Sequence, residues 1–298
     1  MTSETYSAHL TSQSTLNPAI TAWSVYLQDQ GNSPHTIKAF VHDLKLLAGF
    51  LSPTYTLGNI TTVDLNRFLT WLESGRGVPC SPKTLSRRIT ALKSFFRWLH
   101  QYAVIPSNPA EKIVQLAVLS PLPEILTPVE VEQVLEVCKK YQNAAKPDTR
   151  YYALFYLLIS SGIKKNECLT LSKNHIDESD AQHPILFVRY NNPQYRYKER
   201  KIALPPDWLE IYHEYCHQYN ISDQIFPWSQ RRLEYLLEDL SIESGLTKHI
   251  SFDMCRWTCA IRDVLSGMEK EHVRQKLGLS KVQWREISMK IERLIANL

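Results

Sequence analysis

Glycine is scarce in this sequence, with 9 glycines among 298 residues, and stretches in which apolar and polar residues alternate are uncommon. This pattern excludes an extensive β-sheet and favours a mostly helical protein. No apolar run reaches the roughly 20 residues that a membrane-spanning helix needs. The polar opening MTSETYSAHLTSQSTLNP lacks the basic-then-apolar pattern of a signal peptide. We therefore expect a soluble protein in the cytoplasm that does not contact a membrane.

The six cysteines form no CxxC pair. The segment HEYC at 213–216 comes closest to metal-ligand spacing, but no second half accompanies it. Disulfides are rare in intracellular proteins. The sequence therefore predicts reduced, mostly buried thiols, no metal and no cofactor.

Acidic residues are absent from residues 74–110, although the whole chain holds 30 of them. The same stretch carries six cations: Arg76, Lys83, Arg87, Arg88, Lys93 and Arg97. The net charge of +4 comes entirely from residues 1–110, which hold nine Lys or Arg and five Asp or Glu. A local basic excess of this kind predicts a polyanionic partner, of which nucleic acid is the commonest.

Start signals divide the first third of the chain into helices. Residues 15–30, 33–51 and 61–74 have the apolar periodicity of amphipathic helices. A fourth helix over 81–102 opens on a capping serine followed by proline. Its apolar stripe contains Leu85, Ile89, Leu92, Phe96 and Leu99, and its polar stripe contains Lys83, Arg87, Thr90, Ser94 and Arg97. We predict that one face packs into a core and the other meets phosphates.

Five prolines interrupt residues 105–128, which predicts a linker between two domains. Thr127 then caps a new helix, and residues 149–163 are apolar on nearly all sides, as in a core helix. ILFVRY (185–190) and ERKIALP (199–205) are predicted strands joined by the polar, basic tip NNPQYRYK. The last helix, 285–298, has one apolar face, which either packs in the core or contacts another protomer.

Five segments resemble, in order and spacing, the tyrosine recombinases of the phage integrase and Xer type. SPHTIKAFVHDLKLLAGFL, SPKTLSRRITALKSFFRWL, NPAEKI and LPEILTPVEVEQVL are similar to the core-binding domain and linker of that family. SGIKKNECLTLSKNHID is similar to its first catalytic box. The resemblance implies double-stranded DNA as the partner.

The resemblance also implies a mainly α fold in two domains. An N-terminal helical, SAM-like core-binding domain is expected over 15–106, after a polar tail over 1–14. A linker is expected over 107–125. A mixed, mostly helical catalytic-type domain with a small β-sheet is expected over 126–298.

Members of this family attack a DNA phosphate with a tyrosine, clamp the phosphate with two arginines, and move protons with a hairpin lysine and histidines. The first arginine position falls on Lys164, which keeps the charge but loses the bidentate fork. The hairpin lysine position falls on Tyr195, with Arg196 and Lys198 close by, and the second arginine position falls on Arg256.

The remaining catalytic positions are changed. The two histidines of the second-arginine box fall on Asp253 and Trp257, and the next box places Leu279 at the histidine or tryptophan position. The nucleophile position falls on Ser288, since no tyrosine follows Tyr235. A serine would need an activating base, and no histidine follows His272.

Each lost charge-stabilising group typically costs about 100-fold or more in rate, so we do not expect this chain to cleave DNA alone. Lys164, Lys198 and Arg256 are the candidate remnants of a catalytic site. The candidate DNA-binding residues are Lys83, Arg87, Arg88, Lys93, Arg97, Lys164, Arg196, Lys198, Arg200 and Arg256.

Three functions stay open at this point. The first is a DNA-binding accessory or regulatory protein that assembles with another recombinase, or with itself through the C-terminal helix. The second is an active recombinase with a rearranged site or a nucleophile supplied by a partner. The third is a helical protein-interaction module. Arg256 has its own alternative, an internal salt bridge with Asp253 or Glu167.

Overall fold

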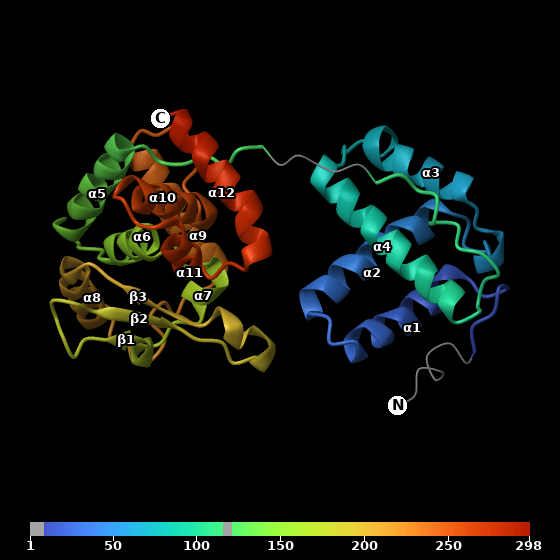
Figure 1. Cartoon of the computed structure of the whole chain (residues 1–298), viewed down its shortest axis with the longest axis horizontal. Coiled ribbons are helices and arrows are strands. Elements are labelled where there is room, and N and C mark those ends of the chain that lie inside the picture. The colour runs from blue at the N-terminus through green and yellow to red at the C-terminus, as the bar shows by residue number, and fades with distance from the viewer. Residues whose placement is uncertain (1–8, 116–120) are drawn as a thin grey trace. The chain divides into compact units, whose positions relative to one another are not determined.

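The computed structural model describes residues 9–115 and 121–298 of the chain. It divides into two compact units, Met1–Ser120 and Pro121–Leu298, each with its own apolar core (Figure 1). Helices dominate both units, and the second also contains a small sheet, so the predicted mainly helical fold is confirmed. Within the described residues, no helix combines the length and the apolar character that crossing a membrane requires.

Within residues 9–115, the first unit contains four α-helices: α1 (Leu16–Asp29), α2 (Pro34–Phe50), α3 (Thr62–Thr70) and α4 (Pro82–Gln101). A 3-10 turn over Leu57–Asn59 precedes α3, and a π-helical turn over Trp71–Gly75 follows it. The predicted start signals are confirmed, because the Ser33 and Ser81 side chains accept hydrogen bonds from backbone N–H groups in the first turns of α2 and α4. Trp23, Phe68 and Phe95 fill the core between the helices.

Part of the predicted linker packs against this unit. Ala110 and Ile113 are buried in its core, and the Thr62 hydroxyl donates a hydrogen bond of 2.8 Å to the carbonyl oxygen of Pro109. The Gln115 amide donates to the carbonyl oxygen of Ser86 at 3.0 Å. Residues 116–120 of the predicted linker and 1–8 of the predicted tail lie outside the described residues.

The helices of the second unit surround a large apolar core and a smaller apolar cluster. They are α5 (Pro128–Gln142), α6 (Arg150–Ser161), α7 (Lys165–Leu169), α8 (Pro206–Gln218), α9 (Gln230–Glu243), α10 (Phe252–Leu265), α11 (Lys270–Lys276) and α12 (Lys281–Ala296). Helix α6 lies in the core, as predicted, and ends at Gly162, which has a φ of 59°. A left-handed residue ends a helix sharply, and here it turns the chain directly into α7.

The three strands β1 (Ile176–Asp177), β2 (Ile185–Val188) and β3 (Arg200–Ala203) form an antiparallel sheet in that order. The two predicted strands are confirmed as β2 and β3. Strand β1 was not predicted, because two residues are too short to show alternation. The tip between β2 and β3 contains a 3-10 turn over Pro193–Lys198, and the register places Arg200 opposite Val188.

The apolar face of α12 packs inside its own unit. Ile291 and Leu294 are buried in a cluster with Ile261, Val273 and Leu277 of α10 and α11. The core alternative for this helix is therefore confirmed for these positions. Leu298, at the end of the predicted face, is 57% exposed.

Candidate nucleic-acid interface

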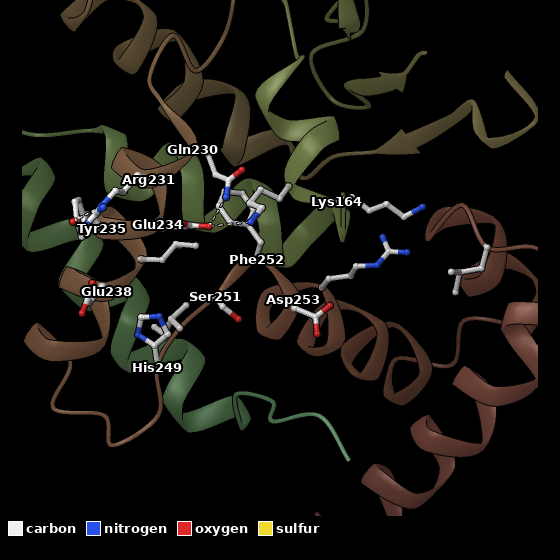
Figure 2. A pocket seen from close by; sticks show the side chains of 15 residues that line it. Lys164, Gln230, Arg231, Glu234, Tyr235, Glu238, His249, Ser251, Phe252 and Asp253 are labelled. Carbon is white, nitrogen blue, oxygen red and sulfur yellow. Dashed lines mark hydrogen bonds and ion pairs between the residues drawn. The ribbon is translucent and has the colours of Figure 1, made fainter. Parts of the chain in front are cut away.

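A cavity of about 900 Å³ opens in the second unit at the start of α7, along α9 and at the start of α10 (Figure 2). Figure 2 shows Lys164 and Asp253 on one side of it and Tyr235 and Glu238 on the other. The lining residues with polar or charged side chains are Lys164, Lys165, Gln230, Arg231, Glu234, Tyr235, Glu238, His249, Ser251, Asp253 and Arg256. Two of the three predicted catalytic remnants thus line one cavity.

Arg256, on α10, bonds to the main chain. One Nη donates to the carbonyl oxygen of Gly162 and the other to the carbonyl oxygen of Leu277. The predicted salt bridge with Asp253 or Glu167 is wrong, because within residues 9–115 and 121–298 no carboxylate lies within ion-pair distance of this guanidinium. Burial lowers the pKa of Arg256 to about 10, which still leaves it charged at neutral pH.

Glu167 is bound by Arg200, the residue that opens β3. The guanidinium donates 3.0 and 2.9 Å hydrogen bonds to the two carboxylate oxygens, and the backbone N–H of Lys164 donates another of 2.7 Å. Tyr190 also donates its hydroxyl to this carboxylate. Burial alone would raise the pKa of Glu167, but these donors and the charge of Arg200 hold it at about 2.

Arg200 is therefore not the surface cation that the sequence predicted. Its side chain is 7% exposed, and its Nε donates a 2.5 Å hydrogen bond to the carbonyl oxygen of Lys276. The guanidinium N–H groups of Arg200 are therefore occupied by acceptors inside the protein, namely the Glu167 carboxylate and a main-chain carbonyl. The prediction of a DNA contact by Arg200 is corrected on this point.

Lys164 immediately precedes α7 and is half-buried. In the described part of the chain its ammonium group has no hydrogen-bond or ion-pair partner. Burial lowers its pKa to about 8; Glu167 opposes this, whereas Arg256, Arg200 and Lys198 lower the pKa further. Of the three predicted remnants, Lys164 and Arg256 line the cavity together, and Lys198 is not among its lining residues.

The hairpin tip carries a cation between two aromatic rings. The Lys198 ammonium lies 4.5 Å from the ring centre of Tyr195 and 5.1 Å from that of Tyr197. Tyr197 is 72% exposed, and Arg196 is exposed as well. Within the tip, both tyrosine rings thus contact the ammonium group of Lys198.

The predicted basic stripe of α4 is only partly on the surface. Lys83 and Arg97 are exposed and Lys93 is half-buried; the last two line a hollow of about 320 Å³. Arg87 is 39% exposed and pairs with the buried carboxylate of Asp43. Lys83, Lys93 and Arg97 are thus available to an outside phosphate.

Arg88 was also predicted to bind DNA, and its position in the structure contradicts that prediction. It is 8% exposed, its Nε lies 3.4 Å from Asp43, and its Nη1 lies 3.3 Å from the sulfur of Cys80. Asp43 on α2 supplies the negative charge that the acid-free stretch lacks. Only the packing of α2 against α4 brings these oppositely charged residues together.

None of the side chains at the changed catalytic positions is a histidine or a tyrosine. Asp253 is exposed in the first turn of α10 and lines the cavity, and Leu279 lines it as well. Trp257 packs in the cluster beneath α12. Ser288 donates its hydroxyl to the carbonyl oxygen of Arg285 at 3.3 Å and is not among the residues that line the cavity.

Several cavity residues were not singled out as site candidates from the sequence, among them Arg231, Tyr235 and His249. Arg231 and Tyr235 lie on α9 and bond to each other, Nε to hydroxyl, at 2.5 Å. No motif marks this helix, since its sequence is that of an ordinary amphipathic segment.

The six cysteines, all within the described residues, are free thiols, and four of them are buried. Within the described residues, no three or more His, Cys, Asp or Glu side chains are grouped so that they could hold a metal ion.

Comparisons with known proteins agree with this architecture. Residues 20–102 match the phage integrase N-terminal SAM-like domain, and residues 124–287 match the phage integrase family. Tyrosine recombinase XerC of Oceanobacillus iheyensis is 28% identical over 269 residues, which cover 85% of each chain. XerC of Lacticaseibacillus casei is 24% identical over 276 residues, 87% of this chain and 89% of the relative.

Among solved structures, the XerH site-specific recombinase, in a post-cleavage complex with a palindromic difH substrate, has a similar fold. The TM-score is 0.71 at 18% identity, and the match covers 97% of this chain and 89% of that one. The fold that the resemblance implied is thereby confirmed.

Proposed function

Because the chain belongs to the phage integrase family of tyrosine recombinases, we propose that it binds double-stranded DNA in site-specific recombination or integration and does not cleave DNA on its own. Its role is accessory or regulatory: it occupies a DNA site, or it assembles with an active recombinase. It acts in the cytoplasm and needs no cofactor.

The contents of the cavity carry this proposal. Lys164 and Arg256 supply two positive charges without carboxylate partners, which suits a DNA phosphate. Cleavage needs a nucleophile and groups that stabilise the developing charge, at about 100-fold or more per group. Here Asp253 takes a histidine position and would repel the phosphate that a histidine would help to bind.

The exposed cations of α4 support the binding half of the proposal. Lys83, Lys93 and Arg97 lie outside the internal pairs that Asp43 forms. Contacts to phosphates give affinity without sequence information, so this face can hold a duplex even where no strand is cut. The difH substrate in the structurally similar XerH complex supports DNA as the ligand.

A salt-dependent gel shift tests binding. A duplex should be retarded at about 50 mM salt and released towards about 200 mM. The logarithm of the binding constant should fall with the logarithm of the salt concentration, with a slope of about 0.9 per neutralised phosphate. The triple variant K83Q/K93Q/R97Q should lower that slope by about 1 per contact removed. The control K139Q/K140Q changes two exposed lysines on α5 and should leave the slope unchanged. No retardation of the parent chain at the lowest salt contradicts the proposal.

The retained charges of Lys164 and Arg256 favour a second candidate, an active recombinase whose nucleophile comes from a partner chain. A nicked duplex that traps the covalent phosphotyrosyl intermediate separates the two functions. The proposal expects that this chain forms no covalent adduct and that adding it does not increase the adduct formed on a partner recombinase. An adduct that requires Lys164 and Arg256 favours the second candidate.

A further inference from the structure

Two adjacent lysines line the same cavity but have different surroundings. Lys165 forms an ion pair with Glu234 at 2.9 Å, and Glu234 also accepts from Gln230 at 3.1 Å, as the dashed lines in Figure 2 mark. Lys164 has no such partner within residues 9–115 and 121–298. Figure 2 shows its side chain extended on the side of the cavity opposite Tyr235. The pair therefore offers one restrained amine and one unrestrained amine at the same opening.

The charges around Lys164 favour a bound anion and an uncharged amine at the same time. Arg256 keeps its charge and has no carboxylate partner in the described chain, and the charge of Lys198 on the hairpin tip also lowers the pKa of Lys164. Glu167, whose charge opposes that shift, is already paired with Arg200. The charged and titratable groups from the elements around Lys164 are Lys165 and Glu167 of α7, Glu234 of α9, Asp253 and Arg256 of α10, Lys198 of the tip and Arg200 of β3.

An amine must be uncharged to act as a nucleophile. With a pKa of about 8, roughly a quarter of Lys164 is uncharged at pH 7.5, against about 0.1% of an ordinary lysine. The cavity is wide enough, at about 900 Å³, for a small metabolite to reach it. Accessibility, an uncharged amine and cations that attract anions thus coincide at one atom, the Nζ of Lys164.

We propose that Lys164 is an acylation site and that its acyl donor is an acyl phosphate. The cations beside Lys164 hold the phosphate group, and the Nζ lone pair attacks the acyl carbon. A C–N amide bond forms as the C–O bond to phosphate breaks. The phosphate leaves with that electron pair, and the proton lost from nitrogen goes to phosphate or to water. The reaction involves no oxidation or reduction.

Acylation removes the positive charge of Lys164 and leaves Arg256 alone to face a phosphate. This consequence rests on the proposed function, since it regulates DNA affinity only if the chain binds DNA. The chemical step itself does not depend on DNA. An arginine, the residue that the family resemblance implies at this position, could not be acylated in this way under the same conditions, because it stays protonated.

Peptide mass spectrometry of the full chain incubated with acetyl phosphate tests the proposal. Lys164 should be acetylated at least about tenfold faster than Lys165, because Lys165 is held in an ion pair with Glu234 and Lys164 is not. Inorganic phosphate should slow the acetylation of Lys164 and leave the acetylation rate of Lys165 unchanged. With p-nitrophenyl acetate, a donor without a phosphate, the preference for Lys164 should shrink.

Two variants test the anion-holding role. R256Q should reduce the preference for Lys164 with acetyl phosphate. K198Q, on the hairpin tip, should also reduce it and serves as the test if R256Q does not fold. Equal acetylation of Lys164 and Lys165, or a preference that neither phosphate nor K198Q alters, overturns the proposal. A gel shift on acetylated and untreated chain is a separate measurement. If neither binds DNA, the proposed function fails while the acetylation result still decides this inference.

Discussion

Arg200 of β3 and Glu167 of α7 form a bidentate ion pair, with N–O distances of 3.0 and 2.9 Å, in a site where both side chains are almost fully buried. This pair links the sheet to the helix that carries Lys164. In the described residues, the cations that line the cavity without a carboxylate partner are Lys164, Arg231 and Arg256. An internal charge pair thus separates the cations that hold the fold together from those that can meet a ligand.

The substitution E167Q should lower the free energy of unfolding by about 3–5 kcal/mol, because it leaves a buried guanidinium without its counter-charge. Urea unfolding followed by circular dichroism measures this change. The control E136Q breaks an exposed pair with Lys139 on α5 and should change stability by less than about 1 kcal/mol. Equal effects of the two substitutions would contradict a stabilising role of the buried pair.

Glu167 should also make stability dependent on acid pH. Its folded pKa is about 2, below the ordinary value of 4.5, so the folded state favours the ionised form. The stabilisation is fully present above about pH 4.5 and is lost as the pH falls towards 2. Urea midpoints measured between pH 6 and 3 should therefore fall less steeply in E167Q than in the parent chain. If the urea midpoints of both chains fall equally with pH, carboxylates other than Glu167 cause the loss of stability in acid.

DNA affinity should fall between pH 7 and 9 as Lys164 loses its proton. Its pKa of about 8 lies below the ordinary 10.5, so the ammonium that attracts phosphate is present below about pH 8 and is lost above it. Loss of one such contact corresponds to roughly a fivefold weaker Kd. Fluorescence anisotropy with a labelled duplex measures this. K164R should remove the pH dependence and K165R should keep it.

Two neighbouring cations of α4 should respond to mutation in opposite ways. K83Q should weaken DNA binding and leave the unfolding midpoint unchanged, since Lys83 is exposed. R88Q should lower the free energy of unfolding by about 1–3 kcal/mol, because it leaves the buried Asp43 with one cationic partner fewer. Gel shifts and urea unfolding of both variants distinguish a binding cation from a structural one. A stable R88Q chain with weakened DNA binding would reverse this assignment.

Removal of the Asp253 carboxylate should strengthen anion binding in the cavity. D253N keeps the size of the side chain and its position in the first turn of α10 but removes the charge that repels phosphate. The Kd for a DNA duplex should improve by a few-fold, roughly 1 kcal/mol. The control D207N lies at the start of α8, outside the residues that line the cavity, and should leave the Kd unchanged. An unchanged affinity in D253N would place the DNA away from this cavity.

Much of the fold follows from local sequence signals. Ser33, Ser81 and Thr127 with the prolines that follow them begin α2, α4 and α5 as predicted, because capping depends only on residues within one turn. The β2–β3 hairpin was also predicted from its own residues. Strand β1 was not, because its place in the sheet depends on pairing with β2 rather than on a pattern of its own.

The sequence by itself determined the helical class, the elements of each unit, and the loss of the tyrosine and the histidines, because these depend on residue identity and short-range pattern. Only the tertiary structure decided which cations are available. Arg88 and Arg200 resemble surface cations in the sequence, yet Asp43 and Glu167, which lie 45 and 33 positions away, neutralise them inside the fold. Arg256 bonds to the carbonyl oxygens of Gly162 and Leu277. Whether two charged side chains form an ion pair depends on the distance between them in space. That distance is set by the folded structure and not by their separation along the sequence.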